Sequence, residues 1–207
     1  QRPRWYRFDL SMIGRLVTQV LLQGVSKRCS LRRSEETVLS TPNGTSMSTP
    51  EVSIRSLSVE IYDTTLRDGA QLEGISLTVD DKLRIAEQLD RLGVHYIEGG
   101  WPGSNPKDDE FFDRARSELE LTHSRLVAFG STRRVKGEVD DDPTLQHLLS
   151  ACTQVVCIVG KASEYHITET LRTSLDEGVA MVADSVNFLK ENDRKVFFDA
   201  EHFFDGY

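Results

Sequence analysis

An arginine and an aspartate stand side by side at Arg67-Asp68, shortly after a β-prone run that leads to Asp63. A guanidinium group is always charged and donates two hydrogen bonds in one plane, so it suits a carboxylate or an oxygen on which negative charge develops. A neighbouring carboxylate is a ligand that hard divalent cations prefer. The same pair also fits a capped turn with a surface ion pair, and spacing alone favours that simpler interpretation.

Other segments carry groups that could take part in binding or proton transfer. Glu98 opens a loop with three glycines and two prolines, and it could bind a substrate or orient Arg67. The segment 130–134 offers hydroxyls and two arginines for a phosphate or coenzyme A contact, although solvated arginines are as plausible. His166 is more often a structural or surface histidine than an acid–base group.

The segment Asp199-Ala200-Glu201-His202 combines two carboxylates with an imidazole. Glu201 and His202 are neighbours in an extended run, so their side chains should point to opposite faces and should not ligate one ion together. We therefore favour Glu201 as a polar or acid–base group over a metal cluster, with an ordinary charged strand end as the alternative.

Strands and helices alternate strictly along the second part of the chain. Short apolar runs predict strands at 59–62, 94–97, 126–129, 155–159 and 195–198. Helical spacing predicts helices between them, including one from Thr78 to a C-terminal Gly93, one over 105–117, one from Asp142, and two over 166–172 and 175–189. Alternation of this kind gives a doubly wound sheet or a (β/α)₈ barrel, and in both folds ligands bind where the strands end. The polar segments all follow predicted strands. Five strands would make only the first five βα units of a TIM barrel.

Charge divides the chain into two parts. Residues 1–57 hold nine Lys/Arg against four Asp/Glu, whereas the whole chain has a formal net charge of -8. The acidic remainder argues against nucleic-acid binding. The acid-free, Arg- and Ser-containing stretch 12–33 followed by a polar linker resembles an organelle transit peptide. We expect a leader at 1–57, with import into a plastid or mitochondrion, or a cytoplasmic location if the leader does not target.

Cysteine usage and hydropathy limit the class of protein further. Three cysteines without a C-x-x-C motif suit a reducing compartment, and we expect Cys152 and Cys157 to be small buried residues. No run reaches the length of a membrane span. The absence of G-x-G-x-x-G, Walker A, H-E-x-x-H and G-x-S-x-G motifs lowers the odds of dinucleotide enzymes, P-loop NTPases, zinc proteases and serine hydrolases.

Four blocks of sequence together resemble a known enzyme family: 63–69 (DTTLRDG), 96–107 (YIEGGWPGSNPK), 128–134 (AFGSTRR) and 199–207 (DAEHFFDGY). They are similar to the 2-isopropylmalate, homocitrate and citramalate synthases, whose barrel is shared with HMG-CoA lyases and the carboxyltransferase domain of pyruvate carboxylase. The second and fourth blocks look most like the citramalate synthase branch. The resemblance covers residues 58–207, the first part of a catalytic barrel.

The resemblance implies roles for single residues. Asp68 matches the aspartate that ligates a divalent metal (Mg, Mn or Zn), and Arg67 matches the arginine that stabilises the oxygen of the 2-oxo acid. Glu201 matches a catalytic glutamate near the reacting acetyl group, while Gln71 and Glu98 match polar residues of the substrate pocket. The implied reaction is a Claisen condensation in which the methyl group of acetyl-CoA attacks the keto carbon of pyruvate and the thioester is then hydrolysed.

The sequence departs from the family pattern in two ways. The His-x-His metal ligands and the C-terminal inhibitor-binding domain do not occur in these 207 residues. We therefore expect this piece alone to be inactive and the complete protein to be an acyltransferase, as a homodimer. The alternatives are a 2-isopropylmalate synthase that uses 2-oxoisovalerate, a lyase that runs the reverse cleavage, or a non-catalytic fragment.

Overall fold

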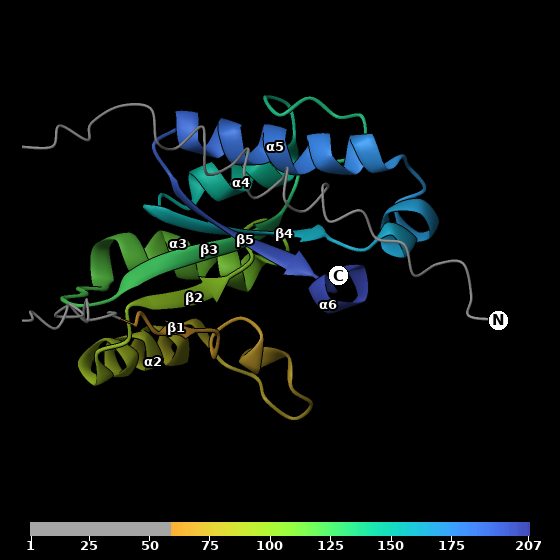
Figure 1. Cartoon of the computed structure of the whole chain (residues 1–207). Coiled ribbons are helices and arrows are strands. Elements are labelled where there is room, and N and C mark those ends of the chain that lie inside the picture. Colours follow the sequence, from red (N-terminus) through yellow and green to blue (C-terminus); the bar gives the residue numbers. More distant parts are fainter. Residues whose placement is uncertain (1–58) are drawn as a thin grey trace, which may run out of the picture.

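A computed structural model of the chain describes residues 59–207 (Figure 1). The predicted leader at 1–57 lies outside the described residues. These begin with β1 (Tyr62–Asp63), a 3-10 turn (Gly69–Gln71), α2 (Val79–Leu92), β2 (Tyr96–Gly100), α3 (Pro106–Glu118) and β3 (Arg125–Ser131). They continue with α4 (Pro143–Ser150), β4 (Val155–Lys161), a π-helical turn (His166–Thr170), α5 (Leu175–Glu191), β5 (Lys195–Glu201) and the short α6 (Phe203–Gly206).

The sheet identifies the barrel architecture. All five strands are parallel, and their order in space is β1-β2-β3-β4-β5, the same as in the sequence. A doubly wound sheet reverses its strand order at a switch point, whereas a barrel adds each strand beside the previous one. The structure is a partial (β/α)₈ barrel, as the sequence predicted.

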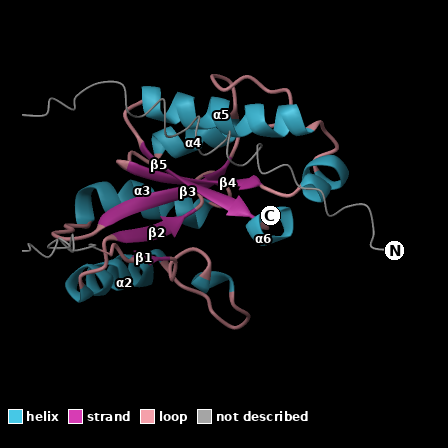
Figure 2. Cartoon of the chain, in the orientation of Figure 1, coloured by secondary structure: helices cyan, strands magenta, loops and turns pink. Residues whose placement is uncertain are grey.

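The two faces of the sheet carry different kinds of packing. One face packs against α2, α3, α4 and α5, and its core includes Ile97, Ala128 and Val156 from the strands. The other face joins strand side chains and one loop residue in a largely aromatic cluster: Tyr62, Tyr96, Trp101, Val127, Phe129, Val155, Cys157, Val159 and Phe197. Figure 2 shows the four long helices along the outer side of the fanned strands. We call the helix-free side the inner face, since it corresponds to the interior of a barrel.

Local sequence signals set the helix ends. Thr78 and Asp81 form a complete capping box at α2, and Gly93 ends that helix in the left-handed conformation with a φ of 86°. Asn105 and Asp142 cap α3 and α4, each followed by a proline at the first helical position. No helix among residues 59–207 is both long and apolar enough to cross a membrane.

Several predicted boundaries were wrong. The predicted loop 98–105 begins inside β2, because Glu98, Gly99 and Gly100 are all buried strand residues. A side chain at Gly99 would run into the ring of Phe111 and crowd Leu126, so glycine lets α3 pack closely against the sheet. The segment 166–172, which was predicted as a helix, forms a single π-helical turn at His166–Thr170. The predicted strand 195–198 is longer than expected, since β5 ends at Glu201. Cys157 is buried as expected, but Cys152 is exposed, because it lies in the turn after α4 with a φ of 57°.

Candidate functional site

Arg67 is held at the carboxyl end of the sheet by a buried glutamate. Its Nε donates to Oε1 of Glu98 at 2.5 Å, and Glu98 is only 1% exposed. The other carboxylate oxygen of Glu98 accepts a hydrogen bond from the hydroxyl of Tyr62, also at 2.5 Å. With both oxygens engaged, Glu98 acts in this structure as the group that orients Arg67, one of its two predicted roles.

Burial raises the pKa values of two side chains near Arg67, Tyr62 and Cys157. Burial raises the pKa of the Tyr62 phenol far above its ordinary value, and the nearby Cys157 and Glu98 reinforce the shift. Burial likewise raises the pKa of the Cys157 thiol to about 12, with the charge of Glu98 acting in the same direction. Tyr62 and Cys157 therefore stay neutral near pH 7.

An aromatic platform fixes the plane of the guanidinium group. Its central carbon lies 3.9 Å from the centroid of the Phe129 ring, and Trp101 packs edge-on against Phe129 with centroids 5.3 Å apart. Such a cation–π contact orients an arginine without using its donors. Within residues 59–207 the Nη2 atom of Arg67 makes no hydrogen bond, so it can donate to a ligand oxygen.

Asp68 lies beside this group and faces solvent. Its carboxylate Oδ1 is 3.4 Å from Nη1 of Arg67, and its side chain is 66% exposed. An accessible carboxylate at this edge fits one ligand position of a hard divalent cation. Residues 59–207 contain no group of three or more His, Cys, Asp or Glu side chains that could hold a metal ion.

Gln71 shares a cavity with Arg67. The cavity has a volume of about 350 Å³ and lies between the segment 66–77 and the loop 101–108. Trp101, Ser104 and Lys107 also line it. Arg67 and Gln71 thus line one cavity, whereas Glu98 lies buried behind Arg67 and contacts it through Nε.

Glu201 occupies the inner face at the end of β5 and pairs with Lys161 of β4. The hydrogen bond from Lys161 lowers the pKa of Glu201 more than burial raises it, and the charges of Lys161, His202 and His166 act in the same direction. The prediction that His202 would point away by strand alternation does not apply, because His202 leaves the strand with a φ of 58° and starts α6. Sequence reasoning missed the pairing role of Lys161.

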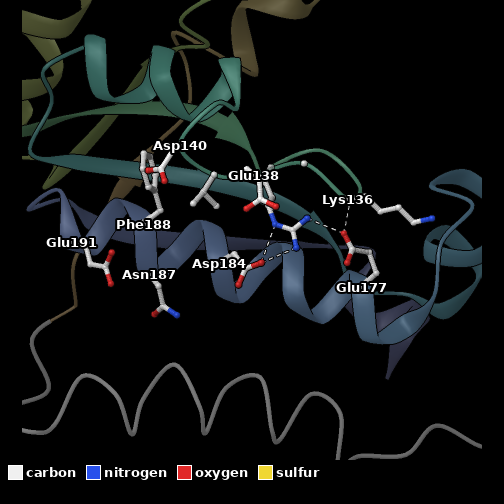
Figure 3. Close-up of a pocket in the computed structure, with 11 residues that line it drawn as sticks. Lys136, Glu138, Asp140, Glu177, Asp184, Asn187, Phe188 and Glu191 are labelled. Carbon is white, nitrogen blue, oxygen red and sulfur yellow. Dashed lines mark hydrogen bonds and ion pairs between the residues drawn. The ribbon is translucent and has the colours of Figure 1, made fainter.

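At Arg133 neither alternative left open for 130–134, a phosphate or coenzyme A contact or a solvated arginine, fits the structure, because this residue is only 5% exposed. Its guanidinium is buried against α5, with Nη1 2.8 Å from Glu177 and Nη2 2.7 Å from Asp184. Figure 3 shows the carboxylates of Glu177 and Asp184 turned toward one guanidinium group. A hollow of about 620 Å³ beside them is lined by further acids, among them Glu138, Asp140 and Glu191. Arg133 therefore ties the end of β3 to the outer helix layer, and the acidic surroundings disfavour a phosphate.

A buried ion pair positions the loop after β2. Lys82, 2% exposed, donates to Asp108 at 2.6 Å, and the same carboxylate accepts from the backbone N–H of Trp101 at 2.9 Å. Gly100 leaves room for this carboxylate, since a side chain there, at a φ of 152°, would strike Asp108. Lys82 is therefore linked to the aromatic platform through Asp108 and Trp101.

A double-mutant cycle tests this link. Lys82→Met and Asp108→Asn are each expected to lower the free energy of unfolding by about 1–2 kcal/mol, because each leaves a buried partner unpaired. The double variant should recover part of that loss, because no unpaired charge remains. Urea unfolding followed by circular dichroism measures all four proteins. Additive losses would show that the two side chains are energetically independent.

Comparison with known proteins shows to which family of sequences this chain is similar. The HMGL-like family model matches residues 58–206. The chain is 57% identical over 150 residues to the (R)-citramalate synthase of Streptomyces coelicolor and 36% identical over 143 residues to the 2-isopropylmalate synthase of Shouchella clausii, covering 72% and 69% of this chain. It spans 28% and 27% of those relatives.

A solved structure supports the fold alone. The HMG-CoA lyase of Bacillus subtilis superposes with a TM-score of 0.53 at 22% sequence identity, covering 68% of this chain and 45% of the lyase. The match agrees with the sequential parallel strands and the outer helix layer. The stronger sequence matches lie with synthases, and the (R)-citramalate synthases match at higher identity than the 2-isopropylmalate synthases.

Proposed function

The chain belongs to the HMGL-like family, and we propose that it forms the first part of the catalytic barrel of a synthase that condenses acetyl-CoA with pyruvate to give citramalate. The observation that carries the proposal is the Arg67–Glu98–Tyr62 arrangement at the carboxyl end of the strands, in a chain 57% identical to an (R)-citramalate synthase. The overall reaction consumes acetyl-CoA, pyruvate and water and releases citramalate and coenzyme A.

In this proposal Arg67 stabilises the negative charge that develops on the keto oxygen of pyruvate as the new carbon–carbon bond forms. Glu98 and Phe129 fix the guanidinium group before the substrate arrives, so that little reorganisation accompanies bond formation. Gln71 lines the neighbouring cavity and would contact the substrate there. Glu201 would lie near the acetyl group, where its carboxylate can take part in proton transfer.

Asp68 would be one protein ligand of a divalent metal ion. A bound divalent ion would act as a Lewis acid on the keto group. The solvent-facing carboxylate of Asp68, next to Arg67, fits that position. We expect the 207-residue chain by itself to show no turnover, since its described residues supply a single ligand there.

A chimera tests the proposed function directly. Residues 58–207 would replace the matching segment of the Streptomyces coelicolor enzyme, and coenzyme A release would be followed with a thiol reagent. We expect release with acetyl-CoA and pyruvate, and much less with 2-oxoisovalerate. The unaltered Streptomyces coelicolor enzyme is the control for the assay.

Two outcomes would contradict the proposal. A chimera that is folded by circular dichroism but releases no coenzyme A with pyruvate would argue against a synthase of this kind. A preference for 2-oxoisovalerate would favour the 2-isopropylmalate synthase reaction, the activity named for the 36%-identical relative.

A further inference from the structure

Lys161 and Glu201 face each other at the last register position between β4 and β5. Side chains alternate along a strand, so Lys161 shares the inner face with Cys157, and Glu201 shares it with Phe197. The ammonium group of Lys161 forms an ion pair with Oε2 of Glu201, and their side chains are 26% and 38% exposed. The pair therefore lies at the mouth of the inner face, accessible to a ligand.

The other charged or titratable groups around Glu201 come from three elements. Asp199 precedes it on β5, His166 comes from the π-helical turn, and His202 and Asp205 come from the start of α6. The rings of His166 and His202 stack with centroids 4.1 Å apart, and Nδ1 of His202 lies 3.0 Å from Asp205. Lys161 is the one lysine or arginine in this described set, and it is the group that pairs with Glu201.

The Lys161–Glu201 ion pair adds little to the stability of the fold. A cross-strand ion pair of this exposure contributes little to the free energy of unfolding, and salt weakens it further. The backbone of the same segment is already fixed, because the N–H of Ala162 donates to the carbonyl oxygen of Glu201 at 3.1 Å. Removing the ammonium group should therefore leave the fold intact while it releases the carboxylate.

We propose that Lys161 is a positioning residue that holds the carboxylate of Glu201 at the inner mouth of the barrel, directed toward the reacting acetyl group. The proposal rests on the proposed function for the acetyl group, but the ion pair itself does not. The pKa of Glu201, lowered by the hydrogen bond from Lys161, is consistent with this role. Without Lys161 the carboxylate would rotate between the nearby imidazoles and solvent.

The first test is a titration of the full 207-residue chain. Carbon-13 NMR of glutamate carboxyl groups would be recorded against pH for the wild type, Lys161→Met and Lys161→Arg, with Glu201→Gln to assign the signal. We expect the midpoint for Glu201 to rise in Lys161→Met and to return to its wild-type position in Lys161→Arg. Lys136→Met, at an exposed lysine of the loop before α4, is the matched control and should leave the midpoint unchanged. An unchanged midpoint in Lys161→Met would overturn the proposal.

The second test uses kinetics in the chimera with the Streptomyces coelicolor enzyme. Lys161→Met should lower kcat about 10-fold and move the acidic limb of its pH profile upward, with an unchanged KM for pyruvate and rescue by Lys161→Arg. A raised KM for pyruvate with an unchanged kcat profile would overturn the positioning role and assign Lys161 to the substrate carboxylate. If the unsubstituted chimera is inactive, the proposed function fails, while the titration still decides whether Lys161 controls Glu201.

Discussion

Replacing Arg67 by lysine is expected to lower kcat of the chimera by about 10²–10³-fold, the loss seen when one preorganised donor is removed from a developing oxyanion. A lysine keeps the positive charge but loses the planar fork, so it cannot bind Glu98 through one nitrogen and the substrate oxygen through another. It also loses the flat contact with Phe129, from whose centroid the guanidinium carbon is 3.9 Å distant. Steady-state coenzyme A release with saturating acetyl-CoA and pyruvate measures the effect.

The same substitution at an exposed arginine is the control for this prediction. Arg91→Lys changes an exposed arginine in the last turn of α2 and should leave kcat within about 2-fold, because surface substitutions away from special features have small effects. Equal activities for Arg67→Lys and Arg91→Lys would mean that Arg67 has no part in stabilising the oxyanion.

Replacing Asp90 by alanine is expected to lower the free energy of unfolding by about 3 kcal/mol. This buried carboxylate near the end of α2 accepts hydrogen bonds from the backbone N–H groups of Thr122, His123 and Ser124 at 3.0, 2.8 and 2.7 Å. Each N–H group left without a partner costs about 1–3 kcal/mol, and water recovers part of it. Urea unfolding of the 207-residue chain gives the value, and Asp141→Ala, at an exposed aspartate before α4, is the control.

The same carboxylate makes the stability depend on pH. Burial alone would raise the pKa of Asp90, but the hydrogen bonds from the backbone of Ser124, Thr122 and His123 outweigh it and hold the pKa well below its ordinary value. A pKa that is depressed in the folded state contributes stability above the unfolded value of about 3.9, and that stability is lost as the pH falls through the folded pKa. The difference in unfolding free energy between wild type and Asp90→Ala should therefore shrink below about pH 4. A difference that stays constant from pH 7 to pH 3 would contradict this assignment.

Much of the architecture follows from local sequence. The sequence placed four of the five strands, the helix start at Thr78, its end at Gly93 and the two Asx-Pro helix starts close to where they appear. The predicted strand 59–62 is the exception, since only its last residue, Tyr62, belongs to β1. The residues that specify each of these elements lie within one helical turn or one strand, so tertiary contacts alter their positions little. The choice between the two α/β folds did not come from periodicity. It came from the family resemblance and then from the sequential strand order in space.

The partners of the charged residues could not be predicted from the same patterns. Arg67 and Arg133 both follow strands, yet one meets Glu98 on the inner face and the other meets Glu177 and Asp184 of α5 on the outer layer. A shift of one residue along a strand moves a side chain to the other face of the sheet, so an arginine near a strand end can serve either layer.

By itself, the sequence determined that Arg67 and Asp68 stand at the carboxyl edge of an α/β fold of one known family. Only the tertiary structure decided that Glu98 and Tyr62 hold Arg67 in place, and that Lys161 faces Glu201. These contacts join residues 31 to 40 positions apart, and they depend on strand register and on which face each side chain takes. Helical and strand periodicity describes each element alone, whereas register is set by the packing of elements against one another.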